Sequence, residues 1–162
     1  MKDFSHIIKT ERLKICLASD DEMRSLIENE TDQGLKAAYG EMLDLSIKYP
    51  ENRKWYAVWF IKLNNGTRIG DLCFKGLSQD GKVEIGYGLL PEYFGNGYAT
   101  EAVLAAVKLA ASQEGVKIIE AETDADNKAS QKVLCKVGFL PTGEIGKEGP
   151  RFYLPAEKLH NA

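Results

Sequence analysis

Two glycines directly ahead of a long alanine-rich stretch are the feature of this sequence that most constrains its fold. Residues 91–102 read Pro-Glu-Tyr-Phe-Gly-Asn-Gly-Tyr-Ala-Thr-Glu-Ala, and apolar periodicity predicts a helix over Tyr98–Ser112. The first amide N–H groups of a helix have no partner inside it and lie at the positive end of its dipole. Because glycines let a bulky anion approach these amides, the geometry suits a pyrophosphate.

This turn differs from the two common nucleotide-binding loops. It lacks the Gly-Lys-Ser/Thr ending of a P-loop, and the third glycine of a Rossmann fingerprint is replaced by Thr100. An ordinary helix-entry turn is the alternative interpretation. The helix is apolar on most sides, and we interpret its narrow polar stripe as a solvated face; the stripe consists of Thr100, Glu101, Lys108 and Ser112.

Hydrophobic patterning divides the rest of the chain into strands and helices. Strands are predicted at Arg12–Leu17, Trp55–Leu63, Arg68–Gly76, Lys82–Leu90, Val116–Thr123, Leu140–Ile145 and Arg151–Leu154. Further helices are predicted from a cap at Asp20 or Asp21 through Glu30, over Gly34–Lys48, and over Lys128–Val137 with Gly138 as its C-terminal cap. Antiparallel hairpins precede a strand–helix–strand crossover, so one α+β domain over residues 1–162 is expected, with a mixed, mostly antiparallel sheet of about six or seven strands and about four helices.

Composition excludes several classes of function. A net charge of −3 argues against a nucleic-acid binder, which would need a basic face. No apolar run reaches the roughly 18 residues that cross a bilayer, and the first residues lack a signal-peptide pattern, so we expect a cytoplasmic protein.

The cysteines and histidines argue against covalent and metal chemistry. Cys16, Cys73 and Cys135 are odd in number and have apolar neighbours, so we expect small buried residues rather than disulfides or a metal site. His6 and His160 lie at opposite ends of the chain, where neither forms an obvious nucleophile pair or metal ligand set.

Four passages together resemble the GNAT superfamily of acetyl-CoA-dependent N-acetyltransferases, and especially the branch that acetylates protein N-termini, including those of ribosomal proteins. They are Thr10-Glu11-Arg12-Leu13, Val83–Tyr87 with Leu90-Pro91-Glu92, Gly95–Ala102, and Asn127–Ser130 with Lys136–Phe139. They follow the family's order and span most of the chain.

The resemblance implies a splayed sheet that grips the pantetheine arm of acetyl-CoA, the cosubstrate. The backbone of Leu89 and Leu90 would pair with that arm, and the Asn127 side chain would hydrogen-bond it. The pyrophosphate would be held by backbone amides of Gly95, Asn96, Gly97, Tyr98, Ala99 and Thr100.

Three positions depart from the family pattern. Glu92 stands where a Gln or Arg often opens the cofactor loop, so backbone amides must hold the phosphates. Leu134 stands where many members carry the tyrosine that protonates the leaving thiolate. Cys16 replaces an Arg that usually ends the opening strand of the branch.

Transfer of an acetyl group to an amine requires a base, because only about one alkylammonium in a thousand is neutral at pH 7. Glu84 is the predicted base, acting through water: it shares one strand face with Gly86 and Gly88, which would leave an open groove beside its carboxylate. A solvent-facing strand glutamate is the alternative.

Ser130 is the predicted replacement acid, since some relatives use the serine at this motif position; a bond to its own helix backbone is the alternative. Lys128, Lys132 and Lys136 form one ridge that would meet the 3′-phosphate of CoA or simply be solvated.

The acceptor would bind between the early helices and the last hairpin, at about 29–50 and 144–152, as the family resemblance implies. Glu28, Glu30 and Asp32 there would attract a cationic amine or be solvated. A protein N-terminus, a polyamine and an aminoglycoside-like amine all fit, and a homodimer is left open. The competing hypotheses are a CoA-binding module without catalysis and an interaction domain without a cofactor.

Overall fold

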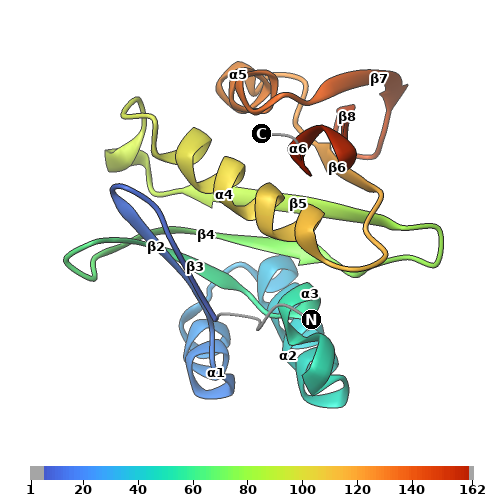
Figure 1. Cartoon of the computed structure of the whole chain (residues 1–162). Helices are drawn as coiled ribbons and strands as arrows, with labels where there is room; N and C mark the ends of the chain where they lie inside the picture. Colours follow the sequence, from blue (N-terminus) through green and yellow to red (C-terminus); the bar gives the residue numbers. More distant parts are fainter. Residues whose placement is uncertain (1–5, 161–162) are drawn as a thin grey trace.

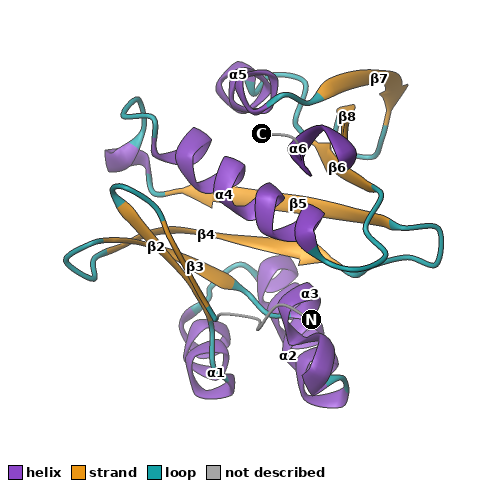
Figure 2. Cartoon of the chain, viewed as in Figure 1, coloured by secondary structure: helices purple, strands orange, loops and turns teal. Residues whose placement is uncertain are grey.

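The computed structural model describes residues 6–160, which form one mixed sheet with helices on both faces (Figures 1 and 2). The eight strands are β1 (Ile7–Lys9), β2 (Leu13–Leu17), β3 (Trp59–Leu63), β4 (Arg68–Lys75), β5 (Lys82–Leu89), β6 (Ile118–Glu122), β7 (Leu140–Ile145) and β8 (Pro150–Pro155). Their order in the sheet is β1-β2-β3-β4-β5-β6-β8-β7, and only the pairing of β5 with β6 is parallel.

The helices fall into two layers. They are α1 (Asp20–Asn29), α2 (Gln33–Lys48), α3 (Arg53–Tyr56), α4 (Tyr98–Ser112), α5 (Lys128–Val137) and α6 (Glu157–His160), with single 3₁₀ turns at Pro50–Asn52 and Pro91–Tyr93. α4 and α5 lie on one side of the sheet, and α1 and α2 lie on the other (Figure 1). Within residues 6–160, no helix has the length and apolar character to cross a membrane.

The predicted mixed α+β architecture is confirmed, and the structure corrects it in three places. β1 adds a strand to the predicted six or seven, and α3 and α6 are short helices beyond the predicted four. Trp55 and Tyr56 were assigned to a strand but belong to α3, where the Trp55 side chain is buried and its ring packs edge-on against Phe74 with the ring centres 5.4 Å apart. Ser19, rather than an aspartate, caps α1 through a reciprocal capping box with Glu22.

α4 is held against the sheet by its small side chains. Ala102, Val103, Ala106, Val107 and Ala110 are fully buried, and α4 packs on β2, β5, β6, α5 and α6. Alanine and valine bring the helix axis close to the strands, and the large buried area keeps its N-terminus in a fixed position relative to β5.

The sheet opens between β5 and β6. The two strands pair at Lys82, Val83 and Glu84, and the pairing ends there although β5 continues to Leu89. β6 instead pairs with β8 along its whole length. The second half of β5 therefore presents an unpaired backbone edge to the opening, as the splayed sheet of the family resemblance requires.

Candidate active site

The loop ahead of α4 has the backbone geometry that anion binding needs. Gly97 is the N-cap of α4 with φ of +80°, and no side chain caps the helix. Gly95 also has positive φ (+78°), and a Cβ atom at this residue would meet open space. The first amides of α4, at Tyr98, Ala99 and Thr100, therefore have no capping partner within the described chain and face a side where an anion can approach.

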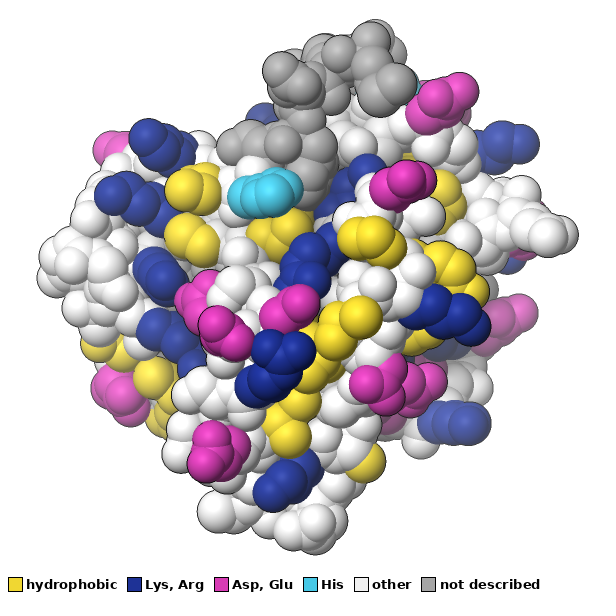
Figure 3. All heavy atoms as spheres, turned by 90° about the horizontal axis from the view of Figure 1, so that it is seen from below, with side chains coloured by type: hydrophobic (Ala, Val, Ile, Leu, Met, Phe, Trp, Pro, Cys, Tyr) yellow, Lys and Arg dark blue, Asp and Glu magenta, His cyan; other side chains and the backbone are white. Residues whose placement is uncertain are grey.

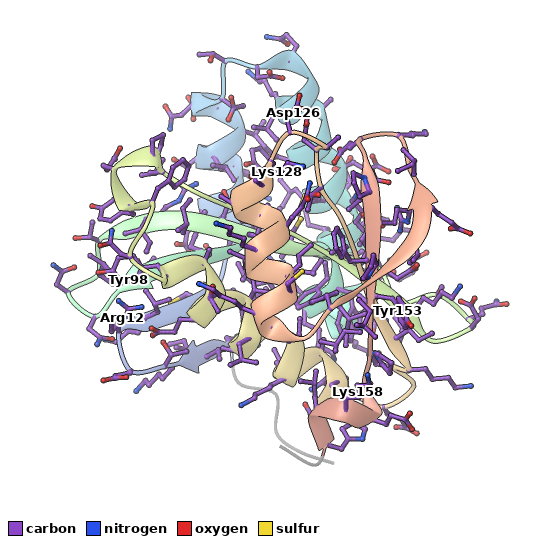
Figure 4. The ribbon with its side chains drawn as sticks, turned by 90° about the horizontal axis from the view of Figure 1, so that it is seen from above. Arg12, Tyr98, Asp126, Lys128, Tyr153 and Lys158 are labelled. Atoms are coloured by element: carbon purple, nitrogen blue, oxygen red, sulfur yellow. The ribbon has the colours of Figure 1, made fainter. Side chains whose placement is uncertain are left out.

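The β1–β2 turn supports this loop from the side. Arg12 donates from Nη1 to the Asn96 carbonyl at 2.9 Å and from Nε to Glu101 Oε1 at 2.7 Å. Thr10 donates to the other oxygen of Glu101 at 2.5 Å. The guanidinium also lies over the Tyr98 ring, 4.4 Å from its centre, and Figure 4 shows the two side chains together.

Glu101 was interpreted as part of a solvated stripe, and that interpretation is wrong for this residue. Burial opposes ionisation of Glu101, but hydrogen bonds from Thr10 and Arg12 outweigh it and lower the pKa of its carboxyl.

Of the two residues whose backbone is predicted to pair with the pantetheine arm, Leu89 but not Leu90 directs its amide toward the opening. The Leu90 N–H donates to the Ile69 carbonyl at 2.8 Å and so faces β4. Because amides alternate between the two edges of a strand, the N–H groups of Leu89 and Tyr87 face the opening toward β6. Leu89 is thus the better placed of the two predicted backbone partners for an extended ligand.

The start of α5 closes the other side of the opening. Asn127 caps this helix by accepting from the Ser130 N–H at 3.0 Å, and within residues 6–160 its amide nitrogen Nδ2 has no partner. The Ser130 hydroxyl lies 2.7 Å from the Tyr87 hydroxyl, so a hydroxyl pair spans the gap between β5 and α5. Tyr87 is buried enough that desolvation raises the pKa of its phenol.

Two further residues bear on whether acetyl-CoA fits this opening. Thr123, at the end of β6, has a buried hydroxyl with no hydrogen-bond partner in the described part of the chain. A buried hydroxyl without a partner is costly, and an amide-bearing ligand in the opening would supply one. Leu134, at the position of the family's tyrosine, is fully buried in the core. The free α4 amides fit the diphosphate of acetyl-CoA. The unpaired β5 edge and the Thr123 hydroxyl fit its pantetheine arm.

Glu84, the predicted base, lies where the opening begins and is held by two cations. Its carboxylate contacts Lys75 Nζ and Arg151 Nη2, each at 2.8 Å, and its side chain is 19% exposed. Burial opposes ionisation, yet hydrogen bonds from Lys75 and Arg151 outweigh it and lower the pKa of Glu84. Arg151 also pairs with Glu122 at 2.9 Å, which ties β8 to β6 beside the opening.

A second carboxylate lies on the same face of the sheet. Asp71 on β4 is the cross-strand partner of Gly88 on β5, and its side chain is 28% exposed. Arg68 contacts it at 3.2 Å, and the Tyr39 hydroxyl from α2 lies 3.5 Å away. Burial raises the pKa of Asp71 in spite of Arg68. A groove of about 300 Å³ runs beside it, lined by Arg68, Gly70, Asp71, Gly88, Leu89 and Leu90.

Other predicted features do not line this groove. Lys128, Lys132 and Lys136 are exposed along α5. Cys135 is exposed, which corrects its predicted burial, and Cys16 and Cys73 are partly buried. Among residues 6–160, no group of three or more His, Cys, Asp and Glu side chains is placed to hold a metal ion.

A larger open hollow of about 530 Å³ lies at the start of α1, and none of the predicted site residues lines it. From the side of α1 and α2, acidic and basic side chains are intermixed over the surface (Figure 3).

Sequence reasoning missed the contribution of Asp71, Tyr39, Tyr87 and Arg151. Alternation along β5 does place Tyr87 on the face that packs against α4 and α5, but its partner Ser130 is 43 residues away. Asp71 and Tyr39 are 32 residues apart, and no spacing signal connects a helix with the strand it covers.

Comparisons with known proteins agree on the family. A family model described as an acetyltransferase (GNAT) domain matches residues 8–140. The chain is 31% identical over 129 residues to the uncharacterized N-acetyltransferase YoaA of Bacillus subtilis (strain 168), which covers 78% of this chain and 72% of that protein.

Solved structures show the same fold. A spermidine N-acetyltransferase from Vibrio cholerae in complex with CoA and spermine matches with a TM-score of 0.74 and 14% identity, over 94% of this chain and 100% of that one. RimL, a ribosomal L7/L12 alpha-N-protein acetyltransferase in complex with CoA, matches with a TM-score of 0.71 and 17% identity, over 92% and 97%. With the family match over most of its length, this chain belongs to the GNAT family and is an acetyl-CoA-dependent N-acetyltransferase.

Proposed function

We propose that this protein transfers the acetyl group of acetyl-CoA directly to a primary amine, at the opening between β5 and β6. The observation that carries the proposal is the unpaired second half of β5, which is followed in the chain by the 3₁₀ turn Pro91–Tyr93, the glycine loop and the uncapped first amides of α4. An extended pantetheine arm would add to this edge as a strand does, with its diphosphate at Gly95, Asn96, Gly97, Tyr98, Ala99 and Thr100.

Three contacts would orient the thioester. The Leu89 N–H, which faces the opening, would donate to the acetyl carbonyl oxygen and stabilise the charge that develops on it. The Asn127 Nδ2 group and the Thr123 hydroxyl would hydrogen-bond the pantetheine amides. Leu90, whose N–H is bonded to Ile69, would contribute its exposed apolar side chain instead.

The proton transfers need an acid and a base. Ser130 would donate a proton to the leaving thiolate, and the hydroxyl of Tyr87 would replace that proton from 2.7 Å away. The base is one of the two carboxylates on the other face of β4 and β5. Glu84 is the candidate from the sequence, and its two cationic partners make it a weak base in this structure.

Direct attack by the amine is favoured over an acetyl-cysteine intermediate. Cys73 is the cysteine nearest to the groove, since it pairs with Gly86 across β4 and β5. Burial raises the pKa of its thiol to about 11, so the thiolate needed for nucleophilic attack is scarce at neutral pH.

The acceptor is proposed to be a protein N-terminus or a small amine such as a polyamine. The support is the pair of structural neighbours, one of which is a spermidine and the other a ribosomal-protein acetyltransferase. We place the reaction in the cytoplasm, and a homodimer is compatible with it.

An amine panel tests the proposal. The protein is incubated with acetyl-CoA and a series of amines and N-terminal peptides, and release of the CoA thiol is followed against an amine-free control. Thiol release that requires an amine, with acetylated amine as the product, is expected. CoA binding without amine-dependent thiol would contradict the proposal and support the alternative, a CoA-binding module.

A further inference from the structure

The two carboxylates on the face of the sheet that α1 and α2 cover differ in their surroundings. Glu84 is saturated by Lys75 and Arg151, each in direct contact. Asp71 has one cationic partner, Arg68, whose side chain is 44% exposed and also lies over the Phe60 ring at 4.4 Å. A substrate cation can therefore replace Arg68 at Asp71 without leaving the guanidinium unsupported. At Glu84, a cation that displaced Lys75 would still meet Arg151, whose side chain is 23% exposed and 2.8 Å from the carboxylate.

The groove beside Asp71 leads to the backbone position where the thioester would lie. Asp71 pairs with Gly88, the residue next to Leu89, and cross-strand neighbours of this kind are about 5.5 Å apart at Cα. A Cβ atom at Gly88 would have no heavy atom within 4 Å, so the space over this residue is open. A primary amine held by Asp71 over Gly88 would thus lie on β5 beside the residue whose amide faces the thioester.

We propose that Asp71 receives the ammonium group of the acceptor and takes its proton, so that the groove over Gly88 selects primary alkylammonium substrates. The inference rests on the proposed function and identifies which of its two candidate carboxylates is the base. Titratable or charged groups that face Asp71 are Arg68 and Cys73 on β4, Tyr39 on α2, Glu30 after α1, and Lys62 on β3, which lies over the ring of Phe60, the cross-strand partner of Asp71. Burial raises the pKa of Asp71, which brings this carboxylate closer to the range in which a base is effective.

The proton balance assigns a destination to each proton. One ammonium proton passes to Asp71 and then to solvent, which leaves a neutral amine. The nitrogen lone pair forms the new C–N bond while the C–S bond breaks, and the electron pair of that bond leaves on sulfur. The second N–H proton passes to solvent as the amide forms. The thiolate takes a proton from Ser130, Tyr87 returns a proton to Ser130, and solvent returns one to Tyr87, so one proton is released in each turnover.

The test compares Asp71→Asn with Glu84→Gln and with Asp44→Asn, a matched change of an exposed aspartate on α2. Two acceptors are used: an alkyl diamine, which is charged at pH 7, and an aromatic amine, which is already neutral. For the diamine, Asp71→Asn should lower kcat/KM by about 100-fold. It should also abolish the increase of kcat/KM with pH that the unmodified protein shows at pH values below the pKa of the amine. For the aromatic amine, the loss should be below about tenfold, because no ammonium proton has to be removed.

Two more variants keep the test decisive. Asp71→Glu should recover part of the activity, and Gly88→Val, which fills open space, should raise the KM for the diamine while the Kd for CoA stays unchanged. The inference is overturned if Asp71→Asn behaves like Asp44→Asn, if both amines lose activity equally, or if only Glu84→Gln removes the pH-dependent rise. It is also overturned if Gly88→Val leaves the KM unchanged. An unmodified protein that releases no thiol with any amine would contradict the proposed function itself.

Discussion

Glu101 on α4 accepts two hydrogen bonds from Arg12, one from its main-chain N–H at 2.9 Å and one from its Nε at 2.7 Å. The two residues are 89 positions apart, and the contact fastens the β1–β2 turn to the first turn of α4. Because Arg12 also donates to the Asn96 carbonyl, it holds the glycine loop on both sides of Gly97. The loop is thereby ordered before any ligand binds, which lowers the entropic cost of binding.

Loss of this contact should weaken CoA binding. Arg12→Ala or Glu101→Gln is expected to raise the Kd for CoA about fivefold, because the loop would then have to be ordered by the ligand. Titration calorimetry measures the change. Arg24→Ala is the matched control, since Arg24 is an exposed arginine that pairs with Asp21 at 3.0 Å on α1. An unchanged Kd for CoA in both Arg12→Ala and Glu101→Gln would show that the Arg12–Glu101 contact has no part in CoA binding.

Substitution of Gly97, which has a positive φ, should affect both the stability of the fold and CoA binding, and a matched substitution at Gly143 separates the two effects. An alanine at +80° is strained, so Gly97→Ala should lower the free energy of unfolding by about 1 kcal/mol and also reduce CoA affinity. Gly143→Ala introduces the same strain at +84° in β7, where a Cβ atom would meet open space. Urea unfolding should give similar losses for the two variants, whereas only Gly97→Ala should affect CoA binding. Equal CoA affinities of Gly97→Ala and Gly143→Ala would argue against CoA binding at the glycine loop.

Ser130 should be needed for departure of the thiol. Ser130→Ala is expected to lower kcat by at least about tenfold with an unchanged Kd for CoA, and Tyr87→Phe by a smaller factor, because Tyr87 acts through Ser130. An acetyl thioester of a more acidic thiol should restore most of the lost rate, since its thiolate needs no acid. Ser112→Ala, at the exposed end of α4, is the control. If the activated thioester gave no recovery, Ser130 would have another role.

Glu84 should stabilise the fold in a pH-dependent way. Its folded-state pKa is lowered below the ordinary value of 4.5, so its ion pairs contribute fully above about pH 4.5 and are lost as the pH falls through the folded-state pKa. Glu84→Gln should therefore reduce the free energy of unfolding at pH 7 by about 2 kcal/mol, and the difference from the unmodified protein should shrink toward pH 3. Urea unfolding across this range measures it. A difference that is constant with pH would contradict the ion-pair account.

Local sequence patterns predicted the elements but few of the contacts between them. The glycine turn, α4 and the Gly138 cap of α5 were predictable because each depends on neighbouring residues, and β5 was predictable from its alternation. Trp55 and Tyr56 suited a strand by propensity but lie in α3, where Trp55 packs against Phe74 of β4.

The contacts that complete the candidate site join distant parts of the chain. The Arg12–Glu101, Tyr39–Asp71 and Tyr87–Ser130 pairs depend on how the helices lie across the sheet, which no local pattern determines. Glu84 illustrates the same limit: its strand face was predicted correctly, but Arg151 approaches it from β8, 67 residues later.

Transfer of a labelled acetyl group tests the central claim most directly. The protein is mixed with acetyl-CoA that carries ¹³C in the acetyl group and with an accepted amine, and both the amine and the intact protein are examined by mass spectrometry during a single turnover. Direct attack predicts that the label appears on the amine nitrogen and never on the protein. Label on a cysteine or serine of the protein, or label found only in free acetate, would contradict the account.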